Sequence, residues 1–594
     1  MKIVRKLIKW NQQGYALLIT IAFIGIALIL LGGMMTWMNG SAVQTQRSNL
    51  FMDSSAAADA ATELALSYMW RDFYAHALAA STNYTGYMPS QTGWPVTFSY
   101  SDGSGTANKT GVSTQPADWS TNWTPLNIFG PRYAGLSAFV QSCTVTSKAT
   151  TSNQTYAVSA TTQQKFDLAA IPIFQFAVFY NLNMEIDPGA TMNLSGPVFS
   201  DGGIWARGLA TFNAEISAAG TVSTNTADPY VSGKTEPNNP TFNEGVTSNA
   251  SSLTMPIGTN SSPTAVQALL GLPPTNVSPY TAAGQSYFVN EANIIVSNST
   301  SALTNLSVFY QDPSASPQIT NIPPDLTIIT TNTVGHSTTY TTNLTYSFVT
   351  NASFYDFREG KTVKAIQLDV GLLSAWMSGA KGSTYNNQMN LHSGHHINSV
   401  YVYNNNPLTT TNMPAVRVTD GATLPTDGLT VVTPDPIYVL GNYNAHGTSA
   451  NNGTNVANTA PASLIGDAIT VLSPQWSDGY TSSTSLGSRT LPTATTVNAA
   501  TFEGIVQSNG TNYSGGVENF LRLLENWGGV NLTYNGSIVV MFPSKFATNQ
   551  WSYGNYYDAP NRNWAFDLNF MTQSGLPPLT PEVYALVRQS WASY

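Results

Sequence analysis

Charge is the scarcest property of this sequence. Charged residues make up 9% of its 594 residues, against about a quarter in an average soluble domain. Only 22 residues are Lys or Arg, they are spread over the whole chain, and the net charge is −9. Binding to nucleic acid requires clustered basic side chains that displace counterions from the phosphates. The composition therefore indicates no nucleic-acid partner.

Cysteine and the common catalytic motifs are also scarce. Cys143 is the single cysteine, so the chain forms no internal disulfide, and we expect this thiol to be part-buried and inert. The sequence contains no G-x-S-x-G, H-E-x-x-H, Walker loop or dinucleotide fingerprint. We therefore expect no cofactor and no enzymatic activity.

Thr, Ser, Asn, Gly and aromatic residues are abundant instead. Hydrophobic residues make up 42% of the chain and aromatic residues 11%, enough to form a core and to exclude a disordered chain. This composition favours a mainly β protein outside the cytoplasm. The length predicts roughly three or four domains, or a solenoid, whose core grows by repetition.

One long hydrophobic run is present, from Tyr15 to Met38. It is uncharged, and its roughly 24 residues are enough to cross a bilayer as a helix at about 1.5 Å per residue. It is longer than the apolar part of a cleaved secretory signal, so we predict a retained transmembrane helix. The positive-inside rule places the N-terminus in the cytoplasm because four basic residues precede the run: Lys2, Arg5, Lys6 and Lys9.

The residues before this run resemble those of a known family. A short basic leader ends at Gly14 and is followed at once by Tyr15 and the hydrophobic helix, an arrangement that resembles a type IV prepilin signal. The resemblance implies that a prepilin peptidase cuts between Gly14 and Tyr15 and that the helix is kept. It also implies a bacterial inner-membrane protein, with its C-terminal region periplasmic or on the cell surface after assembly. The implied partners are the lipid bilayer and other pilins or pseudopilins.

Ile19 departs from the pattern of the major pilins. It is the fifth residue after Gly14, where most major pilins have a Glu that meets the N-terminus of a neighbouring subunit. PilX-like minor pilins and the K-type pseudopilins of type II secretion are similar to this chain in lacking that Glu. The resemblance therefore implies an accessory protein of a type IV pilus or a type II secretion pseudopilus. The alternative is a plain N-terminal anchor that happens to follow a glycine.

The helical pattern continues beyond the membrane run, and we expect one helix over 15–80 after a leader at 1–14. Its outer part is amphipathic and needs a partner, because so long a helix is not supported by its own propensity. The segment 81–165 is predicted to supply that partner. Alternating apolar residues on either side of the polar turn Ala149–Thr155 indicate a hairpin with one buried face.

The segment 166–594 is predicted to be a large β-helix-like region. Leu168–Tyr180 is too short for a second membrane span and indicates buried strand. The units Leu194–Val198 and Phe212–Ile216 repeat an apolar–turn–apolar pattern about 18 residues apart, as solenoid coils do. Phe176–Trp205 and Asn561–Met571 resemble segments of large PilX-like proteins. A series of β-sandwiches is the competing architecture.

Two short helices are expected to interrupt the β pattern. Gly515–Trp527 places Val, Phe, Leu and Trp side chains on one helical face, which suits a cap over an open end of the core. Thr580, Pro581 and Glu582 have the pattern of an N-cap and first turn for a last helix.

Three groups of residues are candidates for sites that involve charge. His392, His395 and His396 are the weak candidates for a metal site, although no acidic residue stands near them in sequence. Four acids in the repeat region could converge in a cleft, as in β-helix glycosidases: Asp435, Asp467, Glu503 and Glu518. Asp356, Arg358, Glu359 and Lys361 form the densest charge group after the leader, and we expect a surface salt-bridge patch.

Aromatic residues beside amides are better candidates for ligand or partner contacts, because such side chains stack on sugars or anchor protein interfaces. Two groups fit, with about half of their members expected in the core: Tyr401 and Tyr403 with Asn404–Asn406, and Trp551, Tyr553, Tyr556 and Tyr557. The sequence thus favours an accessory pilin-like protein that displays a β region for assembly or for adhesion to surface glycans or proteins. A plainly anchored surface adhesin and a polysaccharide-active β-helix enzyme are the alternatives.

We predict that the mature protein begins at Tyr15. A prepilin peptidase would remove the leader after Gly14 and leave the hydrophobic helix in place. N-terminal sequencing of the protein purified from membranes measures this directly. A chain that still begins at Met1 would contradict the prediction.

Overall fold

The structure is a computed structural model of the whole chain. It describes residues 13–74, 98–101, 112–116, 120–125, 136–151, 156–224, 228, 230–231, 240–253, 257, 262–299, 302–312, 319–334, 337–377, 396–445, 456, 458–510, 512–551 and 555–594. The described residues are mainly strands, with one long N-terminal apolar helix, as the sequence predicts. They divide into two compact units. Unit 1 comprises Met1–Asp118, Gln141–Leu168 and Leu586–Tyr594, and unit 2 comprises Trp119–Val140 and Ala169–Ala585.

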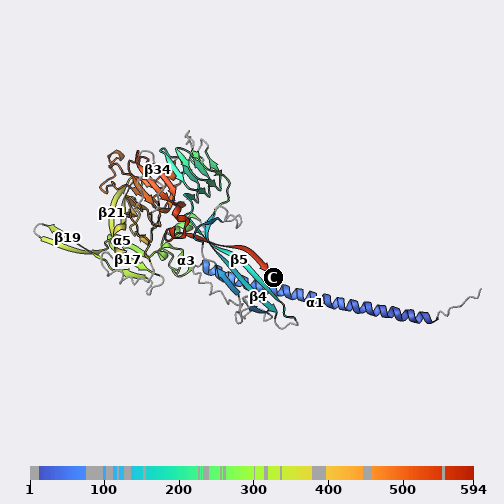
Figure 1. Cartoon of the computed structure of the whole chain (residues 1–594). Helices are drawn as coiled ribbons and strands as arrows, with labels where there is room; N and C mark the ends of the chain where they lie inside the picture. Colours follow the sequence, from blue (N-terminus) through green and yellow to red (C-terminus); the bar gives the residue numbers. More distant parts are fainter. Residues whose placement is uncertain are drawn as a thin grey trace, which may run out of the picture. The chain divides into compact units, whose positions relative to one another are not determined.

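Helix α1 (Gln13–Tyr74) runs through unit 1 as one 62-residue helix (Figure 1). Its mean hydropathy reaches 2.7 over its most apolar window, and within the described part of the chain it alone is long and apolar enough to cross a membrane. Apolar side chains from Tyr15 to Met38 are exposed, among them Leu17 at 68%. The predicted end near residue 80 lies outside the described residues.

The outer part of α1 has a buried face, made mostly of small side chains. From Ser54 onward, buried residues recur three or four apart, as one face of a helix requires: Ser54, Ala58, Ala61, Ala65, Met69 and Phe73. Small residues let a sheet approach the helix axis closely. The change from an exposed to a covered helix therefore occurs at about Ser54.

The sheet of unit 1 includes β1 (Phe98–Ser101), β2 (Val112–Pro116), β4 (Ser137–Thr151), β5 (Ser159–Pro172) and β35 (Glu582–Ser593). The strand order is β1, β4, β5, β35, and β2 also pairs with β4. Along β4 the buried residues alternate: Cys143, Val145, Ser147 and Ala149. The hairpin predicted on either side of the 149–155 turn is thus confirmed as β4 and β5.

Polar contacts join α1 to this sheet within unit 1. Gln164 on β5 donates to Glu63 at 2.8 Å and to Thr62 at 3.0 Å. Arg588 on β35 forms a bidentate ion pair with Glu63, at 2.5 and 2.6 Å. The indole of Trp591 donates to Asp59 at 2.7 Å. One side of α1 is therefore held by β5 and β35 together.

The predicted last helix is a strand. Thr580, Pro581 and Glu582 do not begin a helix, because Glu582–Ser593 forms β35 next to β5. Val583, Ala585 and Val587 are buried in alternation with less buried residues, which is the period of a strand. This strand also returns the chain to unit 1, so the boundaries 81–165 and 166–594 do not match the compact units.

Unit 2 is built from short parallel strands stacked in register. Its first coils contain β6 (Val178–Tyr180), β7 (Met184–Ile186), β8 (Met192–Ser195), β9 (Val198–Ser200), β10 (Ile204–Ala206), β11 (Ala210–Phe212), β12 (Ile216–Ala218), β13 (Val222–Ser223), β14 (Thr241–Phe242) and β15 (Val246–Thr247). Val198 pairs with Ile216, and the side chains of Ser195 and Asn213 bond at 18 residues' separation. The parallel stacking fits the solenoid-like expectation and its 18-residue spacing, and not the sandwich alternative.

The later coils build three sheets. Strands β16 (Ile294–Ser299), β23 (Ser399–Tyr403), β25 (Leu429–Val432), β27 (Ala462–Ile465), β30 (Ala500–Ile505) and β33 (Ile538–Pro543) belong to the first sheet. The second contains β21 (Val349–Asp356), β22 (Lys361–Asp369), β24 (Asn412–Thr419), β26 (Ile437–Leu440), β28 (Ile469–Leu472) and β31 (Arg522–Leu523). The third contains β29 (Thr495–Asn498), β32 (Asn531–Gly536) and β34 (Asn561–Phe566).

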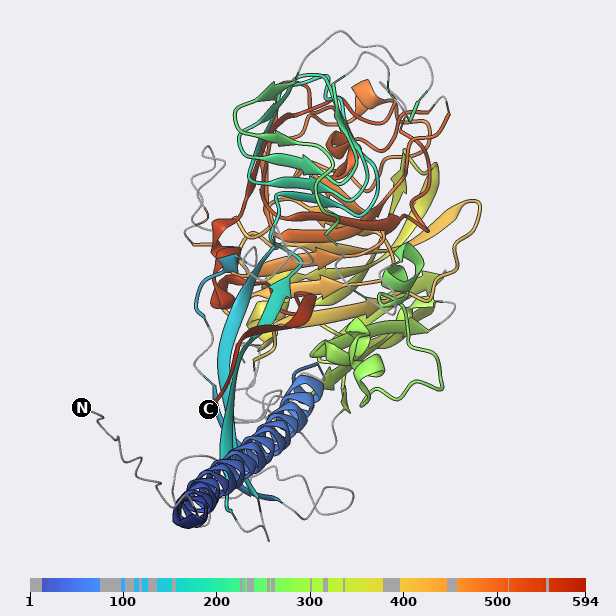
Figure 2. The ribbon, with the colours of Figure 1, turned by 90° about the vertical axis from the view of Figure 1, so that its right-hand side faces the viewer.

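The chain enters this stack in the middle. The first sheet has the order β15, β12, β9, β6, β33, β30, β27, β25, β23, β16. The coils from β6 to β15 thus run to one end, and the chain resumes at the other end with β16. Between them lie the short helices α2 (Pro263–Ala268), α3 (Ala282–Gln285) and α4 (Phe288–Glu291). The last coils return to the first ones, where β33 pairs with β6 and β34 with β8 (Figure 2).

Antiparallel strands are added beside β16. They are β17 (Ala302–Gln311) and β18 (Ile319–Ile322), followed by the hairpin of β19 (Leu326–Val334) and β20 (Ser337–Thr345), which projects from unit 2 in Figure 1. Helix α5 (Val370–Met377) follows β22. The 13 residues Leu168–Tyr180 lie in buried strands and a turn of the sheets, as predicted.

Aliphatic side chains form ladders inside the stack. Ile294, Val400, Val431 and Leu464 are paired in successive strands, and each is fully buried. Burying one such side chain stabilises a fold by about 1.5–3 kcal/mol. The repeated register therefore supplies most of the core.

The predicted capping helix over Gly515–Trp527 is wrong. This segment contains a short 3₁₀ turn, Val517–Asn519, and the strand β31. Its apolar residues are buried, as expected of a cap, but in the core of the stack, and β31 pairs with β28. Apolar periodicity showed which residues are buried and not the backbone conformation.

Gly536→Ala is expected to destabilise unit 2. A Cβ atom there would lie 1.9 Å from the carbonyl oxygen of Ala499 in the neighbouring coil, so the backbone must shift. Overpacking of this kind costs about 1–3 kcal/mol. The unfolding midpoint in urea measures the loss, with Gly487→Ala as the control because no atom lies within 4 Å of its Cβ position. Equal midpoints for both variants would contradict the close contact between coils.

Candidate ligand-binding pocket

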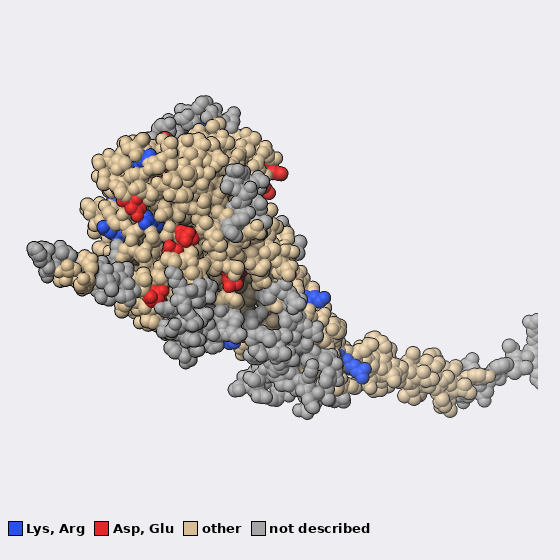
Figure 3. Space-filling model, turned by 60° about the vertical axis from the view of Figure 1, so that its left-hand side comes forward, with Lys and Arg blue, Asp and Glu red and all other residues tan. Residues whose placement is uncertain are grey.

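The densest charge group is buried and not a surface patch. Asp356, Arg358 and Glu359 are at most 4% exposed, while Lys361 at the start of β22 is partly exposed. Asp356 ends β21 and accepts the backbone N–H of Arg358 at 2.7 Å and of Glu359 at 2.8 Å. These bonds fix the turn to β22. The predicted salt-bridge patch is therefore wrong, and Figure 3 shows only scattered charged side chains on the face that it presents.

Glu359 is paired with an arginine from a distant coil. Arg522 donates to it at 2.6 Å, and the backbone N–H groups of Thr548 and Asn549 complete its shell. Arg358 lies nearby, and burial together with the charge of Arg522 lowers its pKa to about 9. Buried charges are tolerated when every polar atom has a partner. This cluster therefore has a structural role between coils.

The four acids that the sequence singled out do not form one site. Asp435, Asp467, Glu503 and Glu518 are all buried. Glu518 accepts the hydroxyl of Tyr513 at 2.6 Å, and Glu503 accepts the backbone N–H of Ile469. Asp435 and Asp467 alone among them line a common pocket, because they follow β25 and β27, which are neighbours in the first sheet.

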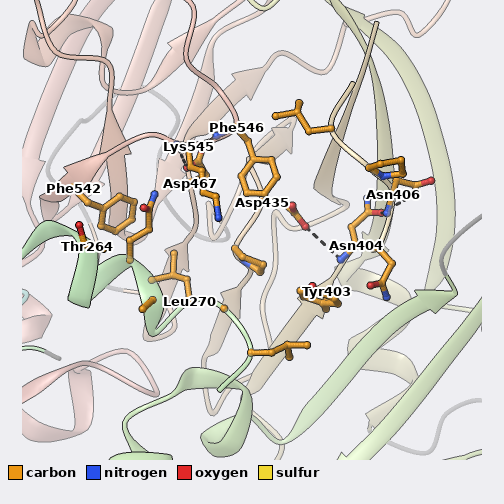
Figure 4. A pocket seen from close by; sticks show the side chains of 18 residues that line it. Thr264, Leu270, Tyr403, Asn404, Asn406, Asp435, Asp467, Phe542, Lys545 and Phe546 are labelled. Carbon is orange, nitrogen blue, oxygen red and sulfur yellow. Dashed lines mark hydrogen bonds between the residues drawn. The ribbon is translucent and has the colours of Figure 1, made fainter. Parts of the chain in front are cut away.

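This pocket has a volume of about 560 Å³ and lies in unit 2 (Figure 4). One wall is made by residues at the ends of strands of the first sheet, and the other by α2 and the residues after it. In Figure 4, Tyr403 and Asn404 lie on one side, Phe542 and Thr264 on the other, and Asp435 between them. Parallel strands of one sheet end at the same edge, which brings residues from distant segments together.

Asp435 is the acid at the centre of the pocket. Its Oδ2 atom accepts the backbone N–H of Asn404 at 3.3 Å. Burial is the largest cause that raises its pKa, to about 7, and Asp467 adds to the shift, whereas Asn404 and Lys545 oppose it. A carboxyl group with this pKa exchanges its proton near neutral pH.

Asp467 is held differently. Its carboxylate accepts three successive backbone N–H groups, from Lys545 at 2.5 Å, Phe546 at 2.8 Å and Ala547 at 2.9 Å. Burial nevertheless raises the pKa of this carboxyl. Its acceptor positions are occupied by the turn after β33, so its first role is to fix that turn.

Three asparagines line the pocket beside Tyr403. The amide of Asn404 is fixed, because it donates to the carbonyls of Lys364 and Ala415 and accepts from Asn406 at 2.7 Å. Asn405 donates to the carbonyl of Asn298 at 2.6 Å. The backbone and amide groups of this turn are thereby held in one arrangement.

The aromatic candidates fall in different places. Tyr401 is in the core, with its hydroxyl donating to the carbonyl of Leu270 at 2.7 Å, whereas Tyr403 is partly exposed and lines the pocket. Trp551 and Tyr556 are partly buried and do not line it, and Tyr557 is buried. Tyr553 lies outside the described residues. Their role in contacts stays a prediction.

The other candidates are placed as follows. His392 and His395 lie outside the described residues, and His396 is exposed and bonds to Asp427 at 2.9 Å. The described residues contain no group of three or more His, Cys, Asp or Glu that could hold a metal.

Gly14 lies in α1, with Tyr15 and Ile19 exposed on it. Cys143 is buried, and burial raises its pKa to about 12, which favours the inert thiol.

Sequence reasoning missed most of the pocket. It singled out Tyr403 and its asparagines, and it weighed Asp435 and Asp467, but it gave no reason to join them with Phe542, Lys545 or α2. The only signal was the strand register, which appears once the coils are stacked.

Comparisons with known proteins give little further support. No protein-family model matches the chain, and no curated protein matches it. One solved structure, the competence-associated pilin ComZ from Thermus thermophilus, aligns with 91% of this chain and 97% of its own, at 10% identity and a TM-score of 0.27. A TM-score of this size carries no argument about shared fold or function.

Asp435→Asn is expected to reduce the pH dependence of stability. The pKa of Asp435 is about 7 in the folded chain and near 4 in the unfolded chain. Its contribution to the free energy of unfolding is therefore complete below about pH 4 and is lost as the pH rises through 7. Between pH 5 and pH 8 the wild type should lose on the order of 2 kcal/mol of unfolding free energy as Asp435 ionises. The variant has no such group, so its stability relative to the wild type should rise by that amount. Unfolding midpoints at both pH values measure this, and the exposed Asp558→Asn is the control. If the unfolding midpoints of the wild type and Asp435→Asn differ by the same amount at both pH values, the raised pKa of Asp435 is contradicted.

Proposed function

We propose that this protein is an accessory pilin-like protein whose long helix enters a type IV pilus or a type II secretion pseudopilus and whose β region is displayed outside the membrane. The observation that carries the proposal is the division of α1 into two parts. Its first part is apolar and uncovered, and its second part is packed on a sheet of unit 1. The leader that ends at Gly14 adds the processing signal.

The uncovered part of α1 requires an apolar environment. Between Tyr15 and Met38 its large apolar side chains are about half to three-quarters exposed. Each of them would cost roughly 1.5–3 kcal/mol to leave in water. A lipid bilayer before assembly and the helices of other subunits afterwards would both cover this surface.

The covered part of α1 is packed firmly on the sheet of unit 1. The small residues Ala58, Ala61 and Ala65 are fully buried, and the ion pair of Glu63 with Arg588 joins the helix to the strand nearest the C-terminus. An exposed pair of this kind contributes about 1 kcal/mol or less. Apolar contact therefore holds the helix, and the polar bonds fix its rotation.

Ile19 favours an accessory position. It is 49% exposed on the uncovered part of α1, and it offers no carboxylate to the N-terminus of a neighbouring subunit. A bulk filament subunit would repeat such an ion pair along the helix bundle. A subunit without this carboxylate suits an accessory position in the assembly, where few copies are needed.

One observation favours the enzyme alternative. Asp435 and Asp467 line the same pocket, and two carboxyl groups are what glycoside hydrolysis requires. The carboxylate of Asp467 is, however, occupied by three backbone N–H groups. The pocket therefore supports binding better than acid–base chemistry.

Gly14→Val is expected to prevent removal of the leader and display of the β region, because the peptidase needs a small residue at the cut. Surface labelling of whole cells and the mass of the purified chain measure both effects. Gly40→Val is the matched control, since it changes a glycine of the same helix with no atom within 4 Å of its Cβ position. Unchanged display of Gly14→Val would favour a plainly anchored adhesin.

A further inference from the structure

We propose that the pocket at the edge of the first sheet of unit 2 binds a neutral saccharide, with one sugar ring against Tyr403. The inference rests on the pocket alone and does not depend on the assembly role of α1. The volume of about 560 Å³ lies within the range of small-molecule sites, about 300–1,000 Å³.

The pocket presents hydrogen-bond acceptors. Among the described residues, the hydrogen bonds of Asp435 use Oδ2, and those of Asn405 and Asn406 use their N–H groups. Asp435 Oδ1 and the side-chain amide oxygens of Asn405 and Asn406 form no hydrogen bond with a described residue. They are also not among the fully buried polar atoms that lack a partner. Carboxylate and amide oxygens accept hydrogen bonds and therefore suit a ligand with many O–H groups.

The pocket also offers apolar rings. Tyr403 and Phe546 are partly exposed and line it, and Phe542 forms a buried apolar wall. A pyranose ring has an apolar face of C–H groups and a rim of hydroxyls, so it can contact an aromatic ring and these acceptors at once.

The charges of the pocket favour a neutral ligand. Lys545 lies beside the Phe546 ring, with Nζ at 5.8 Å from its centroid, and it faces the same space as Asp435. Asp467 is already bonded to three backbone N–H groups, so Lys545 and Asp435 are the charges that a ligand would meet, and they largely offset one another. A phosphorylated or strongly acidic ligand would meet Asp435 with only Lys545 to offset it.

The pocket is pre-formed, which lowers the cost of binding. The turn of Asn404–Asn406 is fixed by bonds to Asn298, Lys364 and Ala415, and the opposite turn is fixed by Asp467. Little conformational entropy is lost when a ligand enters a site that is already ordered.

The test is saturation-transfer NMR and calorimetry on the full chain in detergent micelles. The neutral probes are maltose, cellobiose, lactose and di-N-acetylchitobiose, and the charged probes are glucosamine and galacturonate. We expect at least one neutral probe to bind with a Kd of roughly a millimolar or less and the charged probes to bind more weakly. The proposal is overturned if no neutral probe binds at about 10 mM, or if a charged probe binds best.

Variants locate the binding. Tyr403→Ala should weaken it at least about tenfold, and Tyr403→Phe should retain it, because the ring and not the hydroxyl makes the contact. Tyr340→Ala, at a tyrosine 71% exposed on the hairpin of β19 and β20, is the matched control. Binding that is equal in Tyr403→Ala and Tyr340→Ala would place the sugar elsewhere and overturn the proposal.

A second variant guards against loss of folding. Leu408 is 42% exposed and lines the pocket, so Leu408→Trp should narrow the pocket without disturbing the core and should weaken binding with an unchanged unfolding midpoint. Unimpaired binding to this variant would contradict the site. Gly14→Val should bind the sugar like the wild type, which separates this test from that of pilus assembly.

Discussion

Two strand pairs, β33 with β6 and β34 with β8, join the early and late coils of unit 2. In the first pair Ile538, Val539 and Val540 lie against Val178, Phe179 and Tyr180, all in register and all buried. Without this junction each set of coils would expose a row of unpaired backbone groups and an apolar cross-section. The stacking of the early coils on the late ones depends on it, because the paired segments lie hundreds of positions apart in the sequence.

Three buried acids of unit 2 fix turns between strands. Asp356, Glu359 and Asp467 each accept two or more backbone N–H groups at places where a strand ends. A buried carboxylate costs free energy unless it is fully bonded. At the turns between stacked coils, backbone N–H groups that do not pair with another strand donate to these carboxylates. A low charged fraction and a buried set of acids are therefore two results of one architecture.

The sequence predicted the repetitive parts well and the singular parts poorly. The spacing of Leu194 and Phe212 matched the coil length, since both residues occupy equivalent positions in adjacent coils. Glu582–Ser593 was predicted to be helical because a good N-cap pattern precedes it, although the alternation of Val583, Ala585 and Val587 indicates a strand. Asp356, Arg358 and Glu359 were placed on the surface because charge in a loop usually is, and Arg522, which pairs with Glu359, lies 163 positions away in the sequence.

The sequence by itself determined the uncovered helix and the β-rich character of the rest. An uncharged run beside a basic leader and a chain with 9% charged residues restrict the structure locally, whatever the rest of the fold. Only the tertiary structure decided which residues form the pocket. Asp435 and Asp467 are 32 positions apart in sequence and neighbours in space because β25 and β27 pair in register. That register follows from the stacking of whole coils, which no local pattern contains.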